Sequence, residues 1–317
     1  RFAAVHAIEE AAFYAIPAAR LFGIASVADL DSDLARQLQD DRSALARVLA
    51  RPAVWLRRLA LRRADAVVAV AQQMSEIAKA ESPGTLLFEI RDVPVEGATR
   101  EPDPQVVAAL RAELGLEGRR LIVYTGNVDR RQGLETLLHA MPAIVERHPD
   151  ARLLVVGGSD AGIETLRATA DMLQIGDVVH LIGRRPVATM PEYMGLAEVL
   201  VSPRLEPHAT PLKIFTYMAS GRPIVATDLP THTQVLDGDT AILVPPTPEG
   251  LAEGLNAALD DPEAAAASGA RARQRAAARH TYGHFKRQFA EAYAQVLSKP
   301  DVAGDHAVED AGSIVHG

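Results

Sequence analysis

Lys213 stands two residues after a proline in the stretch from Val201 to Leu236, around which we expect the rest of the chain to be organised. Pro211 predicts the start of a helix, because proline costs nothing at the first helical position and leaves the amides of Leu212 and Lys213 unpaired. Free amides, the positive end of the helix dipole and an ammonium together favour an anion, most simply a phosphate. An ordinary strand-to-helix junction with a solvated lysine also fits this pattern, so these residues alone leave both interpretations open.

The same stretch resembles a known donor-binding core. Its segments are SPR at 202–204 and TPLKIFTYMASGRPIVATDLPTHTQVL at 210–236. They are similar to nucleotide-sugar glycosyltransferases of the GT-B fold, retaining family four, whose pattern has Pro-x-Lys followed by Tyr-Met-Ala-x-Gly-x-Pro-Val-Val-Ala-Thr. The resemblance implies an α/β chain of two Rossmann-like domains, the first of them incomplete. It also implies transfer of a sugar, with retention, from a nucleoside-diphosphate sugar to an acceptor.

Composition limits the classes of protein that fit. The chain has 317 residues, 48% of them hydrophobic, so it can bury a sizeable core and is long enough for about two domains. A net charge of -8 argues against a nucleic-acid partner. The absence of cysteine excludes a disulfide scaffold and thiol chemistry. The sequence has no apolar run long enough to span a membrane and no signal peptide, which favours a cytoplasmic protein. If its acceptor is lipid-linked, we expect the protein to be peripheral at the membrane.

A second glycine-containing turn follows the buried strand that starts at Leu121. Gly126 ends this strand and Gly133 opens the next helix, and a glycine at such a turn lets backbone approach a diphosphate closely. The resemblance implies an arginine just after the first glycine and a lysine just before the second, but Asn127 and Gln132 occupy those places. Arg131 and its neighbour Arg130 could substitute, since guanidinium groups bind phosphate bidentately.

The loop before Pro211 departs from the family as well. Typical members carry two glutamates eight residues apart, the first on donor-sugar hydroxyls and the second on the ribose. Here the positions fall on His208, with Glu206 two residues before it, and on Thr216. A threonine hydroxyl is a weaker, neutral partner for a ribose hydroxyl. The resemblance implies these donor-binding residues: Gly126, Asn127, Arg131, Gly183, Arg184, His208, Thr210, Pro211, Leu212 and Thr216.

Acidic residues follow a short strand in the first half of the chain. Asp31 comes after the strand that begins at Ile24, and ligands of open α/β sheets bind beyond the carboxyl ends of strands. The resemblance implies that Asp31 faces the sugar and that His6 and Glu9 lie on the acceptor side. With Lys213 on the leaving diphosphate, Asp31 and Glu206 complete the expected catalytic set, and neither carboxylate is assigned as a nucleophile.

Turn-forming residues suggest where the domains divide. We expect a partial acceptor-side domain at 1–96, a linker and lead-in helix at 97–118, and a nucleotide-sugar domain at 119–280. A crossover helix at 281–298 and a flexible tail at 299–317 complete the chain. Because Arg1 replaces a starting methionine and few strands precede Pro94, we expect missing N-terminal strands, an unpaired sheet edge and self-association.

Arginines alternate with apolar residues from Arg42 to Arg63, around Trp55. This pattern fits a helix lying on an anionic membrane surface, and it also fits an ordinary solvated surface helix broken at Pro52. Two further interpretations concern the function of the whole chain. A nucleotide-sugar epimerase of the same architecture and a non-catalytic nucleotide-binding fragment both remain open.

The expected ligands follow from the resemblance. They are a UDP- or GDP-sugar and a sugar, lipid-linked or small-molecule acceptor. We expect no cofactor and no metal, because cationic side chains can supply the charge that a metal would bring and the sequence shows no acidic metal motif.

Overall fold

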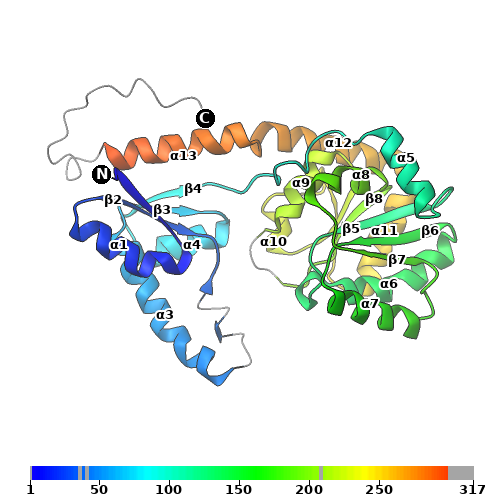
Figure 1. Ribbon diagram of the computed structural model, residues 1–317, viewed down its shortest axis with the longest axis horizontal. Coiled ribbons are helices and arrows are strands. Elements are labelled where there is room, and N and C mark those ends of the chain that lie inside the picture. The colour runs from blue at the N-terminus through cyan, green and yellow to red at the C-terminus, as the bar shows by residue number, and fades with distance from the viewer. Residues whose placement is uncertain (1, 35–37, 40–42, 207–209, 299–317) are drawn as a thin grey trace. The chain divides into compact units, whose positions relative to one another are not determined.

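The computed structural model contains two compact α/β units (Figure 1), formed by residues 1–91 with 285–317 and by residues 92–284. It describes every residue except 1, 35–37, 40–42, 207–209 and 299–317. The predictions for Arg42, His208 and the tail therefore lie outside the described residues. Each unit has one parallel sheet with helices on its faces, which confirms the predicted fold class.

The first unit has four parallel strands in the order β1-β2-β3-β4. Their bounds are β1 Ala4–Ile8, β2 Ala25–Leu30, β3 Ala66–Ala69 and β4 Leu86–Glu89. All four residues of β3 are buried, as expected for a central strand of a parallel sheet covered on both faces. Its helical segments are η1 Glu9–Ala11, α1 Ala12–Leu21, α3 Ala44–Arg63 and α4 Gln72–Glu81.

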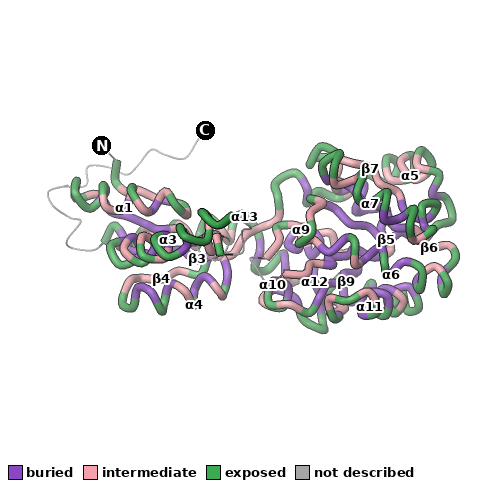
Figure 2. Tube along the Cα trace, turned by 90° about the horizontal axis from the view of Figure 1, so that it is seen from below, coloured by how far each residue is buried: buried purple, intermediate pink, exposed green. Residues whose placement is uncertain are grey.

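Two hydrophobic clusters hold this first unit together. One joins α1, α3 and α4 to the sheet around Ile16, Leu61 and Val67. The other places residues of the helix α13, Tyr282–Leu297, against the opposite face, around Val27, Val68 and Val296. Figure 2 shows buried residues following the strands and exposed residues on the outer sides of the helices. A helix is thus confirmed within 281–298, where one was predicted, and its role as a crossover between the domains stays a prediction.

The second unit has six parallel strands in the order β10-β9-β8-β5-β6-β7. Their bounds are β5 Arg120–Thr125, β6 Ala151–Val156, β7 Val179–Gly183, β8 Val199–Ser202, β9 Ile224–Thr227 and β10 Ile242–Val244. Chain order runs outward from β5 in one direction and from β8 in the other. The carboxyl ends of these two strands therefore flank the switch point, where ligands bind in open α/β sheets.

Helices cover both faces of this larger sheet. They are α5 Pro104–Glu113, η2 Arg130–Gln132, α6 Leu134–Arg147, α7 Asp160–Met172, η3 Val187–Thr189, α8 Met190–Gly195, α9 Leu212–Ser220, α10 Pro230–Thr233, α11 Pro248–Asp260 and α12 Pro262–Arg279. Residues of α6, α7 and α11 share one buried cluster, and residues of α8, α9 and α12 share the other. The core thus fixes α9 and the turns after β5 and β6 on one rigid sheet.

Two expectations about prolines are wrong. Pro211 is the residue that caps α9, with extended backbone angles, and the helix itself begins at Leu212. Pro52 does not break the arginine-rich segment, because α3 runs through it without interruption. Pro52 and Val48 both lie on the exposed side, so water can satisfy the carbonyl that the proline leaves without a donor.

Candidate functional site

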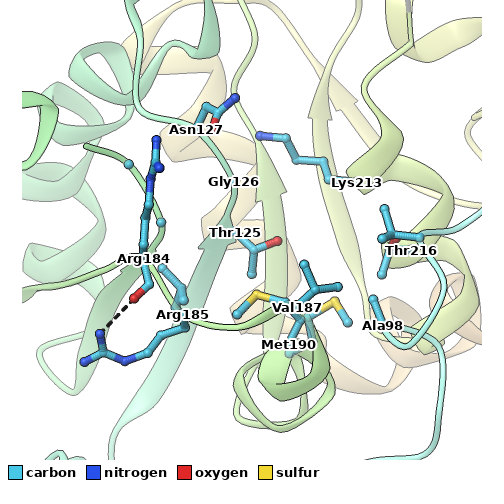
Figure 3. Close-up of a pocket in the computed structure, with 15 residues that line it drawn as sticks. Ala98, Thr125, Gly126, Asn127, Arg184, Arg185, Val187, Met190, Lys213 and Thr216 are labelled. Carbon is cyan, nitrogen blue, oxygen red and sulfur yellow. Dashed lines mark hydrogen bonds between the residues drawn. The ribbon is translucent and has the colours of Figure 1, made fainter.

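A cavity of about 310 Å³ lies in the second unit, at the carboxyl ends of β5, β6 and β7 and beside α9. The site thus occupies the switch-point side of the sheet. Its lining residues are Val95, Ala98, Thr125, Gly126, Asn127, Val156, Gly157, Gly158, Arg184, Arg185, Val187, Met190, Met194, Lys213 and Thr216. Figure 3 shows the Lys213 side chain extending toward Gly126 and Asn127, with Val187 and Met190 on another wall.

Lys213 is held in place by two contacts from the β5 side of the cavity. Its Nζ donates a hydrogen bond to Gln132 Oε1 at 3.0 Å and lies 3.8 Å from the centroid of the Tyr124 ring. A Cβ at Gly126 would come within 3.3 Å of this Nζ, so glycine leaves room for the ammonium. Lys213 is therefore positioned by neutral partners, so an anionic ligand would not have to displace a carboxylate from its Nζ.

The electrostatic surroundings disfavour the charged form of this lysine. Burial lowers the pKa of Lys213 well below its ordinary value, and the nearby Arg204 lowers it further while Asp129 acts in the opposite sense. Burial, together with repulsion from Arg131, also lowers the pKa of Arg204. Burial lowers the pKa of His232 to about 4, so this histidine is neutral at pH 7. The surroundings thus destabilise the charged forms of Lys213 and Arg204, and a bound anion would stabilise those charged forms.

Backbone turns bring the strand ends close together at the cavity. A Cβ at Gly157, whose φ is +123°, would lie 2.1 Å from the carbonyl oxygen of Gly126, so only glycine fits there. The amide of Gly157 donates to the carbonyl of Gly183 at 2.8 Å, and the amide of Gly126 donates to that of Val156 at 2.9 Å. The cavity floor is therefore bare backbone, which a bulky anionic ligand can approach closely.

Helix α9 is anchored to β5 from below the cavity. The buried Tyr217 hydroxyl accepts a hydrogen bond from the Thr125 amide at 2.8 Å, and burial raises the pKa of this tyrosine to about 12. The next residue toward the helix start, Thr216, is 6% exposed, and its Oγ1 finds no hydrogen-bond partner among the described residues. Thr216 thus presents a buried, unpaired hydroxyl at the cavity wall.

Four of the predicted donor-binding residues line this cavity, Gly126, Asn127, Arg184 and Thr216, together with Lys213, which was predicted as catalytic. Outside its lining are five other predicted donor-binding residues, Arg131, Gly183, Thr210, Pro211 and Leu212, and the predicted catalytic residue Glu206. Arg131 is exposed and pairs with Asp129 at 3.5 Å. The carbonyl of Glu206 accepts from Arg204 Nε at 3.3 Å, and Thr210 Oγ1 accepts from Gln234. The roles assigned to all of these residues stay predictions.

Several lining residues were not anticipated. Val187, Met190 and Met194 form the apolar part of the wall, and Arg185 stands beside Arg184. In the sequence, the apolar residues are indistinguishable from ordinary core residues of a short helix. The only available signal was their place after a strand that ends in glycine, Gly183.

The predicted acceptor-side residues cluster within the first unit. The Nε2 of His6 donates to Asp29 Oδ2 at 2.9 Å, and its Nδ1 lies 2.7 Å from the Tyr293 hydroxyl. Burial raises the pKa of Asp31, and the charges of Glu9 and Asp29 raise it further. Asp29, one of the acidic residues predicted at the carboxyl end of this strand, thus links the His6 side of this unit to Asp31.

Two features are absent from the described residues. No group of three or more His, Asp or Glu side chains there has an arrangement suited to a metal ion. Within the same residues, every helix is too short or too polar to span a bilayer.

Comparisons with known proteins identify related chains. The family model for Glycosyl transferases group 1 matches residues 119–261. The chain is 28% identical over 260 residues to alpha-D-kanosaminyltransferase of Streptomyces kanamyceticus, a match that covers 80% of this chain and 66% of the relative. It is 35% identical over 162 residues to phosphatidyl-myo-inositol mannosyltransferase of Mycolicibacterium smegmatis, covering 49% and 40% respectively. The chain thus spans less than two thirds of the length of either relative.

A similar solved structure is that of Alr3699/HepE from Anabaena in complex with UDP. It superimposes with a TM-score of 0.80 and 17% sequence identity, covering 92% of this chain and 78% of that one. At this identity the likeness concerns the fold. It includes both parallel sheets, since the match extends over nearly the whole chain.

Proposed function

We propose that this protein transfers a glycosyl residue from a nucleoside-diphosphate sugar to an acceptor. The grounds are that residues 119–261 belong to the group 1 glycosyltransferase family and that the chain has the GT-B fold. The observation that carries the proposal is Lys213. Its ammonium is buried at the switch point of a parallel sheet, beside bare glycine backbone. Such a site suits a diphosphate, which carries negative charge and needs close approach.

The chemistry follows from where charge develops. As the glycosidic bond to the leaving diphosphate breaks, the diphosphate oxygens gain negative charge, and a preorganised cation stabilises that change. Lys213 is fixed by Gln132 and Tyr124 before any ligand arrives, so little reorganisation is needed. Asn127 and Gln132 are neutral where other members of the family carry cations, so Lys213 has the leading role in this proposal.

The rest of the cavity fits the remaining parts of a donor. The apolar wall of Val187, Met190 and Met194 is suited to the flat face of a base. The unpaired hydroxyl of Thr216 is suited to a ribose hydroxyl. The UDP complex of the Anabaena protein supports a uridine nucleotide as one candidate donor. Retention of the anomeric configuration, and the parts played by Asp31 and Glu206, belong to the same proposal.

The acceptor is proposed to use the first unit. Glu9 and Asp31 directly follow β1 and β2, where side chains can meet a polyhydroxylated molecule, and His6 lies within β1. The carboxylates of Glu9 and Asp31 suit sugar hydroxyls. Acceptors to be tried are therefore small sugars and sugar lipids.

The test begins with donor binding and continues to turnover. Thermal unfolding is followed with UDP, GDP, UDP-glucose and GDP-mannose, because a ligand that binds only the folded state raises the melting temperature. The stabilising donor is then incubated with candidate acceptors, and the product is analysed by NMR. We expect free nucleoside diphosphate and a glycoside that keeps the donor's anomeric configuration.

Two results would contradict the proposal. Conversion of the donor to an epimerised nucleotide sugar would indicate an epimerase. Tight donor binding without acceptor-dependent release of diphosphate across the acceptor panel would indicate a nucleotide-binding module.

A further inference from the structure

Helix α3 of the first unit exposes an apolar stripe that no described residue covers. Leu45 is 67% exposed, Val48 70% and Trp55 62%. The buried residues of α3 begin only at Ala50, so its first turns project from the body of the unit (Figure 1). Exposed large apolar side chains in this number on a single helix indicate an interaction surface.

Arginines lie beside this stripe. Helix α3 contains six arginines and no acidic residue, in a chain whose net charge is -8. At the helical period, Arg47, Arg51 and Arg58 follow one another along a row next to Val48 and Trp55. The exposed side of the helix is therefore divided lengthwise into an apolar strip and a basic strip.

Only part of this positive charge is neutralised within the protein. Arg57 is buried between Asp33 and Glu81, with contacts of 2.6 and 2.7 Å, and Arg58 is 3.5 Å from Glu81. Arg47 and Arg51 are exposed and form no salt bridge with any described residue. The buried arginine fixes the helix to α4, whereas the two free arginines remain available to an external anion.

We propose that α3 docks the first unit on the surface of an anionic phospholipid bilayer. Such a surface offers negative headgroups to Arg47 and Arg51 and, a few ångströms deeper, a medium that accepts Leu45, Val48 and Trp55. From Leu45 to Trp55 the exposed stripe covers about 15 Å of helix, so this part of α3 can lie along the interface. The lengthwise division into apolar and basic strips matches this layered environment.

A second copy of the chain is a poorer match for the same surface. Two α3 helices packed together would bring two rows of arginines close to each other, and α3 has no acidic residue that could form a salt bridge with them. Arg47 and Arg51, which form no salt bridge with a described residue, favour a negatively charged partner. A bilayer also satisfies the apolar strip without requiring a shaped groove.

Trp55 allows a direct experiment because it is the only tryptophan of the chain. Its fluorescence is recorded while vesicles of phosphatidylglycerol and phosphatidylcholine, or of phosphatidylcholine alone, are added at low and at high salt. Co-sedimentation of the protein with the vesicles gives the partition coefficient. We expect a blue shift and co-sedimentation with the anionic vesicles, weakened by salt and nearly absent with the neutral ones.

Matched variants identify the two strips. The double variant Arg47→Gln/Arg51→Gln should lower the partition coefficient about fivefold for each arginine removed. Leu45→Ser/Val48→Ser should lower it by roughly tenfold or more. Two control variants change exposed residues of the second unit, Arg119→Gln and Met172→Ser, and should bind vesicles as the wild type does. Circular dichroism confirms the fold of each variant.

Three outcomes would overturn the proposal. The first is a wild type that neither shifts nor sediments with anionic vesicles at low salt. The second is vesicle binding that the arginine and apolar variants share undiminished. The third is a lipid-free dimer, seen by sedimentation equilibrium, that the same variants dissociate. The experiment does not involve nucleotide, so it can fail or succeed independently of the proposed transferase activity.

Discussion

The two units have the same parallel-sheet layering but carry opposite charge at the carboxyl ends of their strands. In the second unit these ends carry Lys213, Arg184 and bare glycine turns. In the first unit they carry Glu9, Asp29 and Asp31. One scaffold therefore provides a site suited to an anion and another suited to hydroxyl groups. The function of each unit follows from the residues placed after its strands, since the layering itself is shared.

The pKa directions reflect the same contrast. In the second unit, burial among positive groups lowers the pKa of Lys213, which an anionic ligand would reverse. In the first unit, burial and neighbouring carboxylates raise the pKa of Asp31, which a hydrogen-bond donor or a cation would reverse. Each unit is thus electrostatically incomplete without a ligand of the opposite kind.

The largest expected effect concerns Lys213. Lys213→Ala should weaken binding of UDP-glucose or GDP-mannose about 10- to 100-fold, because a charge-assisted contact to a diphosphate is worth about 1.5–3 kcal/mol. Arg130→Ala is the matched control, since this exposed arginine lies outside the cavity lining. Titration calorimetry measures both. Equal losses in the two variants would mean that the diphosphate is held elsewhere.

The pH dependence of donor binding should be the next largest effect. The pKa of Lys213 is lowered in the empty site and a bound diphosphate should raise it, so donor binding should be accompanied by proton uptake at a pH between these two pKa values. Donor affinity should therefore fall as the pH rises through the pKa of the empty site. A nucleotide sugar has no phosphate ionisation near neutrality, so it is the ligand of choice. Calorimetry in buffers of different ionisation enthalpy should show proton uptake, and Lys213→Ala should abolish it. Uptake unchanged in that variant would assign the proton to another group.

Thr216 tests the ribose contact on a smaller scale. Thr216→Val keeps the side-chain shape and removes a buried hydroxyl that lacks a partner among the described residues. Stability in denaturant should stay the same or rise, while donor affinity should fall about 3- to 10-fold, the worth of one neutral hydrogen bond. A loss of stability together with unchanged affinity would show that the hydroxyl serves the fold.

Asp31 provides the smallest effect, in the first unit. A carboxyl whose folded pKa is raised is destabilising when ionised, so Asp31→Asn should stabilise the protein at pH 7 by less than about 1 kcal/mol after solvent screening. The gain should shrink as the pH falls, because the wild-type carboxyl then becomes protonated. Urea unfolding at pH 7 and pH 4.5 measures this. A destabilised variant at pH 7 would contradict the assigned direction.

The sequence allowed prediction of features that depend on local pattern. Gly221 ends α9 with a positive φ of 72°, and Lys213 lies in its first turn as expected. These follow because helix ends and glycine turns are governed by near neighbours in the chain. The same pattern predicted Pro211 as the first helical residue, whereas Pro211 is the capping residue and the helix begins at Leu212. Only the backbone angles distinguish these two positions.

Contacts between distant residues could not be predicted in this way. Gln132 was noted as a departure from the family, yet its contact with Lys213 joins residues 81 positions apart. Likewise, Arg57 was one arginine among many until folding placed Asp33 and Glu81 around it. Packing decides which cationic side chains form salt bridges within the protein and which remain unpaired. The residue types in the sequence do not reveal this.

Hydrogen exchange with and without UDP and GDP tests the central claim most directly, because it reads both units in one experiment. We expect slower amide exchange at 125–128, 157–158 and 212–216 when the preferred nucleotide binds, and unchanged exchange at the ends of β1 and β2. Protection confined to the first unit, or no protection at the glycine turns under saturating nucleotide, would contradict the assignment of the anion site to the second unit.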